Sequence, residues 1–318
     1  MKPFASSIPS PPAAWAQFHI GPLTVHTYAL CILAGIVAAV LITGVRLRHR
    51  GAPEGLALDA AIWAVPLGIV VARIYHVVTH PGDYFAAGDD LWNVFAIWDG
   101  GNAIYGAEIG GAVGLWIACR RAGIRFLSFA DALAPALLVA QATGRLGNWF
   151  NHELFGVPTT LPWGLQIEAS NPKFPPGLPA GTLFSPLFLY EIVWDLLGAL
   201  VIVLLERRVA LRWGRAIAVY FVWYGIGRAY LESIRIDPTS GGLLGVPDNE
   251  WTSFLLVALG VVLFVVQLRR HPGPEPDVRL PRLVDAPAED QAVLDVPRPM
   301  ASQPVGARDP GPGLDDAR

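Results

Sequence analysis

Charged side chains are scarce in this sequence, which excludes an ordinary soluble domain. Aspartate, glutamate, lysine and arginine make up 15% of the 318 residues, whereas soluble domains average about 25%. Hydrophobic residues make up 53%, so we expect the chain to lie in lipid. The formal net charge of −3 indicates little by itself, and no nucleic-acid partner is expected.

Cysteine and metal-ligand patterns are also nearly absent. The two cysteines, Cys31 and Cys119, lie inside apolar runs, where buried small side chains are the simplest interpretation. No set of histidine, cysteine and carboxylate residues has convincing ligand spacing, so we expect no metal and no other cofactor. Residues 1–20 lack the apolar core and cleavage site of a secretory signal.

Long apolar stretches make up most of the sequence before the tail. Each is near the ~20 residues that a helix needs to cross a bilayer. The stretches are 24–45, 56–79, 104–119, 126–142, 185–205, 214–232 and 251–268. They predict an all-α integral membrane protein with about seven transmembrane helices. In the third stretch, Gly106, Gly110 and Gly114 form a ridge of small residues suited to tight helix packing.

The arginines of the loops indicate an orientation in the membrane. Alternate loops are basic, and the loops between them hold few basic residues. The basic loops contain Arg46, Arg48, Arg50, Arg120, Arg121, Arg125, Arg207, Arg208, Arg212, Arg215, Arg269 and Arg270. Because basic loops face the cytoplasm, the N-terminus is predicted outside and the C-terminus inside.

Residues 1–270 are predicted to form one polytopic membrane domain. Within it, residues 80–103 contain two tryptophans and are typical of an interfacial or re-entrant segment. A small external head is expected within about 144–184, where proline and glycine are frequent. Residues 271–318 mix proline with charged residues and hold few aromatics, which predicts a disordered cytoplasmic tail.

The most informative stretch follows the apolar run from Phe126 to Ala142. Gly144 to Gly156 reads Gly-Arg-Leu-Gly-Asn-Trp-Phe-Asn-His-Glu-Leu-Phe-Gly, which places a polar cluster at the membrane boundary. A charge at the bilayer centre costs roughly 2.5–3.5 kcal/mol on insertion scales, so such residues are rare and usually functional. A polar cap on a helix end would explain one arginine, whereas the whole cluster favours a site.

A second set of polar residues ends at the same boundary. Tyr224, Arg228, Glu232 and Arg235 are spaced by four, four and three residues, which places them on one helical face. The alternative is an ordinary surface ion pair between Arg228 and Glu232, which is less natural at a membrane edge.

The stretch from Gly144 to Gly156 resembles the signature of the bacterial phosphatidylglycerol–prolipoprotein diacylglyceryl transferases, G-R-x-G-N-F-x-N-x-E-x-x-G. Trp149 stands where that signature has Phe. Other matches run from about Ile8 to Arg235, most of the chain before the tail. The resemblance implies transfer of the diacylglyceryl group of phosphatidylglycerol to the lipobox cysteine of a prolipoprotein signal peptide. It also implies a multi-pass protein of the bacterial cytoplasmic (inner) membrane, in contact with membrane lipids, with its active site toward the outer face.

The resemblance implies roles for individual residues. The implied catalytic residues are Arg145, Glu153, Arg228, Glu232 and Tyr105. The implied phosphatidylglycerol-binding residues are Tyr28, Arg145, Asn148, Gly156, Tyr224 and Arg228. Pro186 and Tyr190-Glu191 are similar to the family's H-P-x-x-x-Y-E segment, with Ser185 in place of its His.

The base that deprotonates the substrate thiol is left open by the sequence. Many family members have a proposed histidine base where this chain has Tyr105, and a tyrosine with pKa near 10 accepts protons poorly. Glu153 or water is the favoured acceptor, and His76 and His152 are alternatives. Glu108, inside an apolar stretch, has no assigned role.

Two other functions fit parts of the pattern. A transporter would also place charges among membrane helices, although its site typically lies at the midplane in repeated halves. Another phospholipid-headgroup transferase would use the same arginines with a different acceptor. The gathering of polar residues toward one face favours interfacial chemistry.

Overall fold

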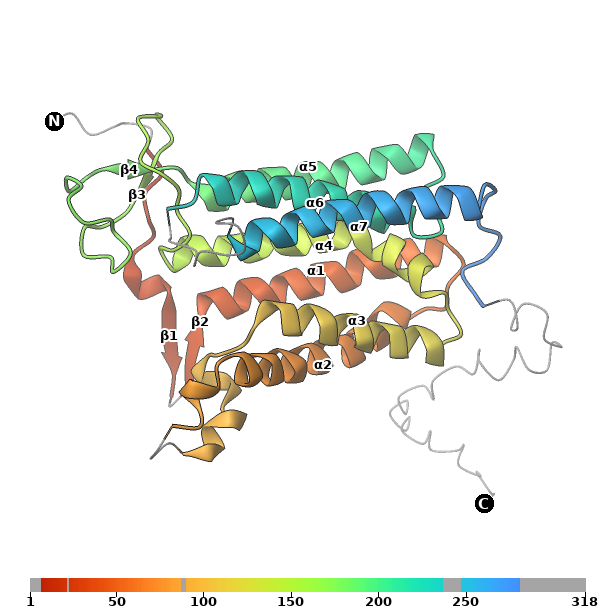
Figure 1. Ribbon diagram of the computed structural model, residues 1–318, viewed down its shortest axis with the longest axis horizontal. Coiled ribbons are helices and arrows are strands. Elements are labelled where there is room, and N and C mark those ends of the chain that lie inside the picture. The colour runs from red at the N-terminus through yellow and green to blue at the C-terminus, as the bar shows by residue number, and fades with distance from the viewer. Residues whose placement is uncertain (1–6, 22, 87–89, 237–246, 281–318) are drawn as a thin grey trace, which may run out of the picture. The chain divides into compact units, whose positions relative to one another are not determined.

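Seven α-helices form within the described residues, where the apolar stretches predict them. Each stretch is long enough and apolar enough to present a continuous apolar surface as a helix. The computed structural model describes residues 7–21, 23–86, 90–236 and 247–280 (Figure 1). The helices in this part are α1 Thr27–His49, α2 Leu56–Thr79, α3 Ile104–Arg121, α4 Phe126–Phe150, α5 Leu187–Arg208, α6 Arg215–Ser233 and α7 Asp248–Arg270. The predicted helical character of all seven stretches is therefore confirmed.

Five of these helices, within the described residues, are long and apolar enough to cross a membrane. They are α1, α2, α4, α5 and residues Asn249–Arg270 of α7. Helix α3 has 18 residues and includes a glutamate and two arginines, and α6 carries Arg215, Arg228 and Glu232. The structure thus supports a mostly helical membrane protein. The prediction that all seven helices cross the membrane stays a prediction for α3 and α6.

Helices α1 and α4 pack on each other and lie between the α2–α3 pair and the group formed by α5, α6 and α7 (Figure 1). The predicted glycine ridge lies at the α2–α3 contact. A Cβ atom on Gly110 would come within 2.3 Å of the carbonyl oxygen of Leu67, and one on Gly114 within 2.5 Å of that of Trp63. The two helices are therefore too close for any larger side chain.

Helices α5 and α6 are held in register by two tryptophans. The indole N–H of Trp194 donates to the carbonyl of Trp223 at 3.1 Å, and that of Trp223 donates to the carbonyl of Trp194 at 3.0 Å. Their rings stack at 4.5 Å. Each indole covers a glycine of the opposite helix, Gly198 or Gly227, where a Cβ would clash with it. We call this pair the tryptophan clasp.

Two small hairpins lie at the end of the bundle where α1 begins (Figure 1). Strands β1 Gln17–Ile20 and β2 Leu23–His26 pair antiparallel, with Gln17 opposite His26. Strands β3 Leu165–Gln166 and β4 Leu183–Phe184 also pair antiparallel, over a small apolar core. That core contains Phe155, Leu165, Ile167, Phe184 and Phe188.

The non-helical part of the segment 144–184, where an external head is expected, begins at Asn151. Helix α4 continues to Phe150, because Gly147 and Asn148 are buried on its inner face and extend the packed surface beyond the apolar run. This non-helical part is joined by the N-terminal segment through a bridge between Ile8 and Leu165.

The described residues of the segment 80–103 form three short 3₁₀ helices, η2 Pro81–Asp83, η3 Leu91–Phe95 and η4 Ile97–Asp99. Arg73 of α2, which is buried, donates to the carbonyls of Val94 at 2.8 Å and Gly100 at 2.6 Å. These bonds hold the segment against α2, and its interfacial position stays a prediction.

Residues 271–280, expected to belong to the disordered tail, instead pack against the helical bundle. The backbone of Arg125 donates to Val278 at 2.8 Å, and that of Leu280 donates to Gly123 at 2.8 Å. Val278 is buried in the core cluster formed by α1 to α4. A single buried apolar residue, Val278, is enough to hold this segment because it packs against a core that the helices already form. The remainder of the predicted tail, 281–318, lies outside the described residues.

Candidate active site

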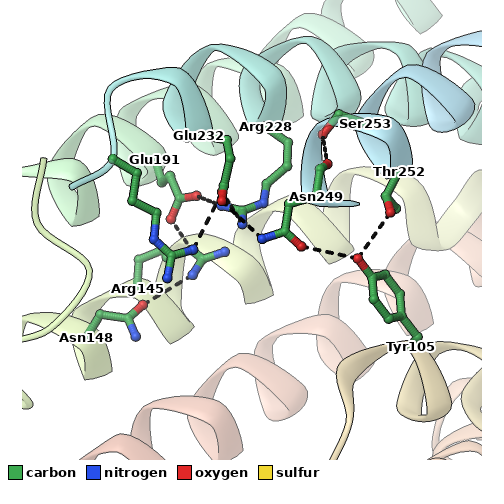
Figure 2. A network of polar contacts seen from close by, with 10 residues as sticks. Tyr105, Arg145, Asn148, Glu191, Arg228, Glu232, Asn249, Thr252 and Ser253 are labelled. Carbon is green, nitrogen blue, oxygen red and sulfur yellow. Dashed lines mark hydrogen bonds and ion pairs between the residues drawn. The ribbon is translucent and has the colours of Figure 1, made fainter. Parts of the chain in front are cut away.

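Five helix ends meet at the end of the bundle that carries the hairpins, and each brings a polar side chain (Figures 1 and 2). The C-terminal ends of α4 and α6 bring Arg145 and Arg228. The N-terminal ends of α5, α7 and α3 bring Glu191, Asn249 and Tyr105. We call the connected residues the arginine–carboxylate network.

Glu191 joins the two arginines that the sequence singled out. One carboxylate oxygen is paired with Nε of Arg145, and the other accepts from Nη1 of Arg228 at 3.1 Å. The side chain of Glu191 is 10% exposed, whereas those of Arg145 and Arg228 are 20% and 21% exposed. The two arginine side chains are therefore more accessible than the carboxylate that joins them.

Glu232 forms the second buried anchor. Its carboxylate accepts from Nη2 of Arg228 at 2.8 Å and from Nδ2 of Asn249 at 3.0 Å, and it lies 3.5 Å from Nη1 of Arg235. Its side chain is 1% exposed. The Arg228–Glu232 pair is thus present at the predicted spacing of four residues, but it is buried rather than a solvated surface pair.

Tyr105 reaches the network from α3. Its hydroxyl donates to Oδ1 of Asn249 at 3.3 Å and lies 3.1 Å from the hydroxyl of Thr252 (Figure 2). Asn249 in turn donates to Glu232, so three successive contacts link Tyr105 to Arg228. The hydroxyl orients an amide rather than an arginine.

The motif residues Asn148 and Glu153 extend the network on the other side. Nη1 of Arg145 donates to Oδ1 of Asn148 at 3.3 Å, and Nδ2 of Asn148 donates to Oε1 of Glu153 at 3.1 Å. Asn151 donates to the same oxygen at 3.2 Å. The second oxygen of Glu153 takes part in neither contact.

Three predicted binding residues lie outside this chain of contacts. Tyr28 packs its ring on Gly147, where a Cβ would come within 2.4 Å of it. Tyr224 stacks on Tyr220 with ring centroids 5.8 Å apart. Gly156 lies at a tight backbone crossing, where its N–H donates to Ser185 at 2.9 Å. Packing accounts for these three positions, and substrate contact by any of them stays a prediction.

The two alternative histidine bases are engaged elsewhere. His152 has Nδ1 2.5 Å from Glu168 and Nε2 2.7 Å from the carbonyl of Pro11, so both ring nitrogens are occupied within the head. Nδ1 of His76 lies 3.0 Å from the hydroxyl of Tyr84, and its ring stacks on His80. Neither has a described contact with the arginine–carboxylate network.

Sequence reasoning gave no site role to Glu191 and Asn249, which are both members of the network. Glu191 was noticed only as part of a resemblance, and no local signal shows that it faces arginines on α4 and α6. Asn249 gave no signal, because its partners are far away in the chain. Among the described residues, no group of three or more His, Cys, Asp and Glu is placed to hold a metal ion.

Helices of membrane-spanning length, with arginines and carboxylates gathered at one end, define a multi-pass membrane protein with a polar site. The family model described as "Prolipoprotein diacylglyceryl transferase" matches residues 16–266. The chain belongs to this family.

Its relatives are similar over most of their length. A phosphatidylglycerol–prolipoprotein diacylglyceryl transferase from Leifsonia xyli subsp. xyli is 58% identical over 289 residues, which cover 88% of this chain and 86% of the relative. Proteins of the same name from Frankia alni and Bifidobacterium longum are 46% and 43% identical. They cover 85% and 86% of this chain, and 70% and 89% of their own lengths are matched.

Proposed function

We propose that this protein transfers the diacylglyceryl group of phosphatidylglycerol to the lipobox cysteine of prolipoproteins and releases glycerol phosphate. Family membership supports the reaction, because the relatives carry the two substrates in their name. The observation that carries the proposal within the structure is the convergence of Arg145 and Arg228 on Glu191.

The two arginines suit a phosphate better than they suit a purely structural role. The described contacts of Arg145 use Nε and Nη1, and those of Arg228 use Nη1 and Nη2. Nη2 of Arg145 and Nε of Arg228 remain for an incoming oxygen. Guanidinium groups bind phosphate oxygens through charge-assisted hydrogen bonds, which are stronger in a water-poor site.

In the proposed reaction, the substrate thiolate attacks the carbon of the diacylglyceryl moiety that bears the phosphate. A carbon–sulfur bond forms, the carbon–oxygen bond to phosphate breaks, and the oxygen leaves as glycerol phosphate. Negative charge grows on the phosphate as that bond breaks, so contacts from Arg145 and Arg228 strengthen in the transition state. Glu191 and Glu232 hold both guanidinium groups in place beforehand.

The proton of the substrate thiol requires an acceptor, because a cysteine with pKa near 8.5 is mostly protonated at neutral pH. We assign Glu153, whose Oε1 is fixed by Asn148 and Asn151 and whose Oε2 is outside these contacts. Tyr105 is a positioning residue in this proposal, acting through Asn249 on Glu232.

The direct test is incubation of the purified protein with labelled phosphatidylglycerol and a lipobox peptide. We expect a labelled thioether product and free glycerol phosphate. Arg145→Ala and Arg228→Ala should each lower kcat more than they raise KM, because the lost contact is made mainly in the transition state. If either variant stays within about threefold of wild type, that arginine is not part of the site.

The same assay separates the alternative functions. A different phospholipid-headgroup transferase would consume the lipid without modifying the peptide, and a transporter would do neither. The network lies at helix ends rather than at midplane breaks, which argues for chemistry at the interface.

We also propose that α3 and α6 span the membrane with the other five helices and that the site faces outward from the cytoplasmic (inner) membrane. This orientation follows from the basic loops, which lie at the other helix ends. A cysteine placed within residues 170–180 should react with an impermeant thiol reagent in intact cells, and one placed after Arg270 should not. The reverse labelling would overturn the orientation.

A further inference from the structure

A polar cavity lies at the opposite ends of α5 and α6 from the arginine–carboxylate network. It has a volume of about 390 Å³ and is formed by the end of α1, the end of α5 and the loop that leads to α6. Its charged lining residues are Arg46, Arg50, Glu206, Arg207, Arg208 and Arg212. Five arginines against one glutamate make this basic pocket strongly cationic.

The floor of the basic pocket is rigid. Oε1 of Glu206 accepts from both Arg46 and Arg50, each at 2.8 Å. Arg46 also donates to the carbonyl of Asp131 at 3.1 Å. That carbonyl lacks its helical partner because residue 135, four positions later in α4, is a proline without an N–H. The side chains of Arg46 and Arg50 therefore already have partners within the protein.

The three remaining arginines line the cavity but do not form such contacts. Within the described residues, Arg207, Arg208 and Arg212 have no ion-pair partner. The loop that carries Arg212 is fixed nonetheless, since Leu211 is buried and the N–H of Gly214 donates to Asp131 at 2.7 Å. The backbone that carries Arg212 is thus fixed beside the cavity, while its side chain and those of Arg207 and Arg208 are without an ion-pair partner among the described residues.

We propose that the basic pocket binds a phosphate-bearing anion, distinct from the substrate that enters the arginine–carboxylate network. Arginine forks match phosphate oxygens in geometry and charge. The volume suits a lipid headgroup or a small phosphate ester, and basic pockets between membrane helices are typical headgroup sites. Arginines that only set the orientation of the protein in the membrane could lie anywhere in the loops. Here they line one cavity, beside the hydrogen-bonded group of Arg46, Arg50 and Glu206.

The test measures binding of dioleoyl phosphatidic acid, which carries a phosphate but no glycerol headgroup, to the purified full-length protein. Native mass spectrometry counts bound lipids for wild type and for the Arg207→Gln/Arg208→Gln/Arg212→Gln variant. Each arginine near a membrane surface strengthens anion binding about fivefold, so we expect one fewer bound lipid and roughly a hundredfold weaker binding at that site. Peptide transfer should stay within about threefold of wild type, which shows that the outward site is intact.

A matched control removes three other arginines, as Arg48→Gln/Arg120→Gln/Arg121→Gln. These belong to basic loops at the same helix ends but do not line the cavity. The control should bind phosphatidic acid like wild type. Equal binding by the pocket variant and wild type, or an equal loss in the control, would overturn the proposal.

Two further arms complete the experiment. If the triple variant does not fold, the exposed pair Arg207→Gln/Arg208→Gln replaces it, with a loss of roughly 25-fold expected from the same estimate; unchanged binding would count against the pocket. Glycerol 3-phosphate in solution identifies the source of the anion. Displacement of phosphatidic acid at millimolar concentration assigns a soluble ester, and retention assigns a lipid headgroup.

Discussion

Replacing Glu191 by glutamine tests how the two arginines of the site are oriented. The substitution preserves the size of the side chain and removes the negative charge between Arg145 and Arg228. Arg228 would keep Glu232 as a partner at 2.8 Å. Arg145 would lose the carboxylate paired with its Nε, so it should be the more displaced of the two.

The expected magnitude follows from the contacts. A hydrogen bond between charged groups contributes about 1.5–3 kcal/mol, and the amide oxygen of glutamine can still accept one of the two. Loss of one such contact, together with repulsion between the guanidinium groups, gives about 2–4 kcal/mol. That corresponds to a reduction of kcat/KM by roughly 30- to 900-fold. The assay is peptide transfer with phosphatidylglycerol, with kcat and KM measured separately.

The chain provides a matched control in Glu206. It also bridges two arginines, Arg46 and Arg50, but at the other end of α5. Glu206→Gln should lower the melting temperature about as much as Glu191→Gln does, while transfer stays within about threefold of wild type. The reasoning is refuted if Glu191→Gln keeps near wild-type kcat/KM, or if Glu206→Gln loses as much activity.

Two further predictions concern the proton acceptor and the packing of the motif helix. Tyr105→Phe should lose substantial activity, Tyr105→His should retain some, and Glu153→Gln should be the most severe, measured as transfer rate against pH with substrate below KM. Full activity in Tyr105→Phe with a dead His76→Ala would instead assign a histidine base. Gly147→Ala should cost about 1–3 kcal/mol of unfolding free energy and reduce transfer, because its Cβ would lie 2.4 Å from the ring of Tyr28. Gly144→Ala, with nothing within 4 Å of its Cβ, should melt at or above the wild-type temperature, and equal melting of the two variants would contradict the packing argument.

The helices were predictable because length and hydropathy are local properties of the chain. The same holds for Arg228 and Glu232, whose spacing of four residues places them on one helical face whatever surrounds them. Hydropathy alone ended α4 too early, at Ala142, because it treats polar residues as a boundary. Asn148 is polar and buried, and the helix continues past it to Phe150.

Long-range contacts were beyond the reach of these rules. Glu191 meets partners 46 and 37 positions away in the chain (191 − 145 and 228 − 191), and Asn249 meets Tyr105 across 144 positions. Which helix ends meet depends on packing, and no periodicity encodes it. The packed segment 271–280 was missed for a similar reason, since its partners, such as Gly123, Arg125 and Arg215, lie far away in the chain.

The tryptophan clasp has a consequence for how the site works during turnover. It is built from neutral groups, the indole N–H of each tryptophan and the carbonyl of the other, so salt and charge changes affect it little. A slip of one residue between α5 and α6 would shift Glu191 by about 1.5 Å and break the clasp. In the proposed reaction, the arginines can therefore take up and release a phosphate oxygen while their glutamate contacts and the helix backbones stay in place. A cycle of the proposed reaction then requires only side-chain motion at the arginines, which occurs on a picosecond-to-nanosecond timescale for accessible groups.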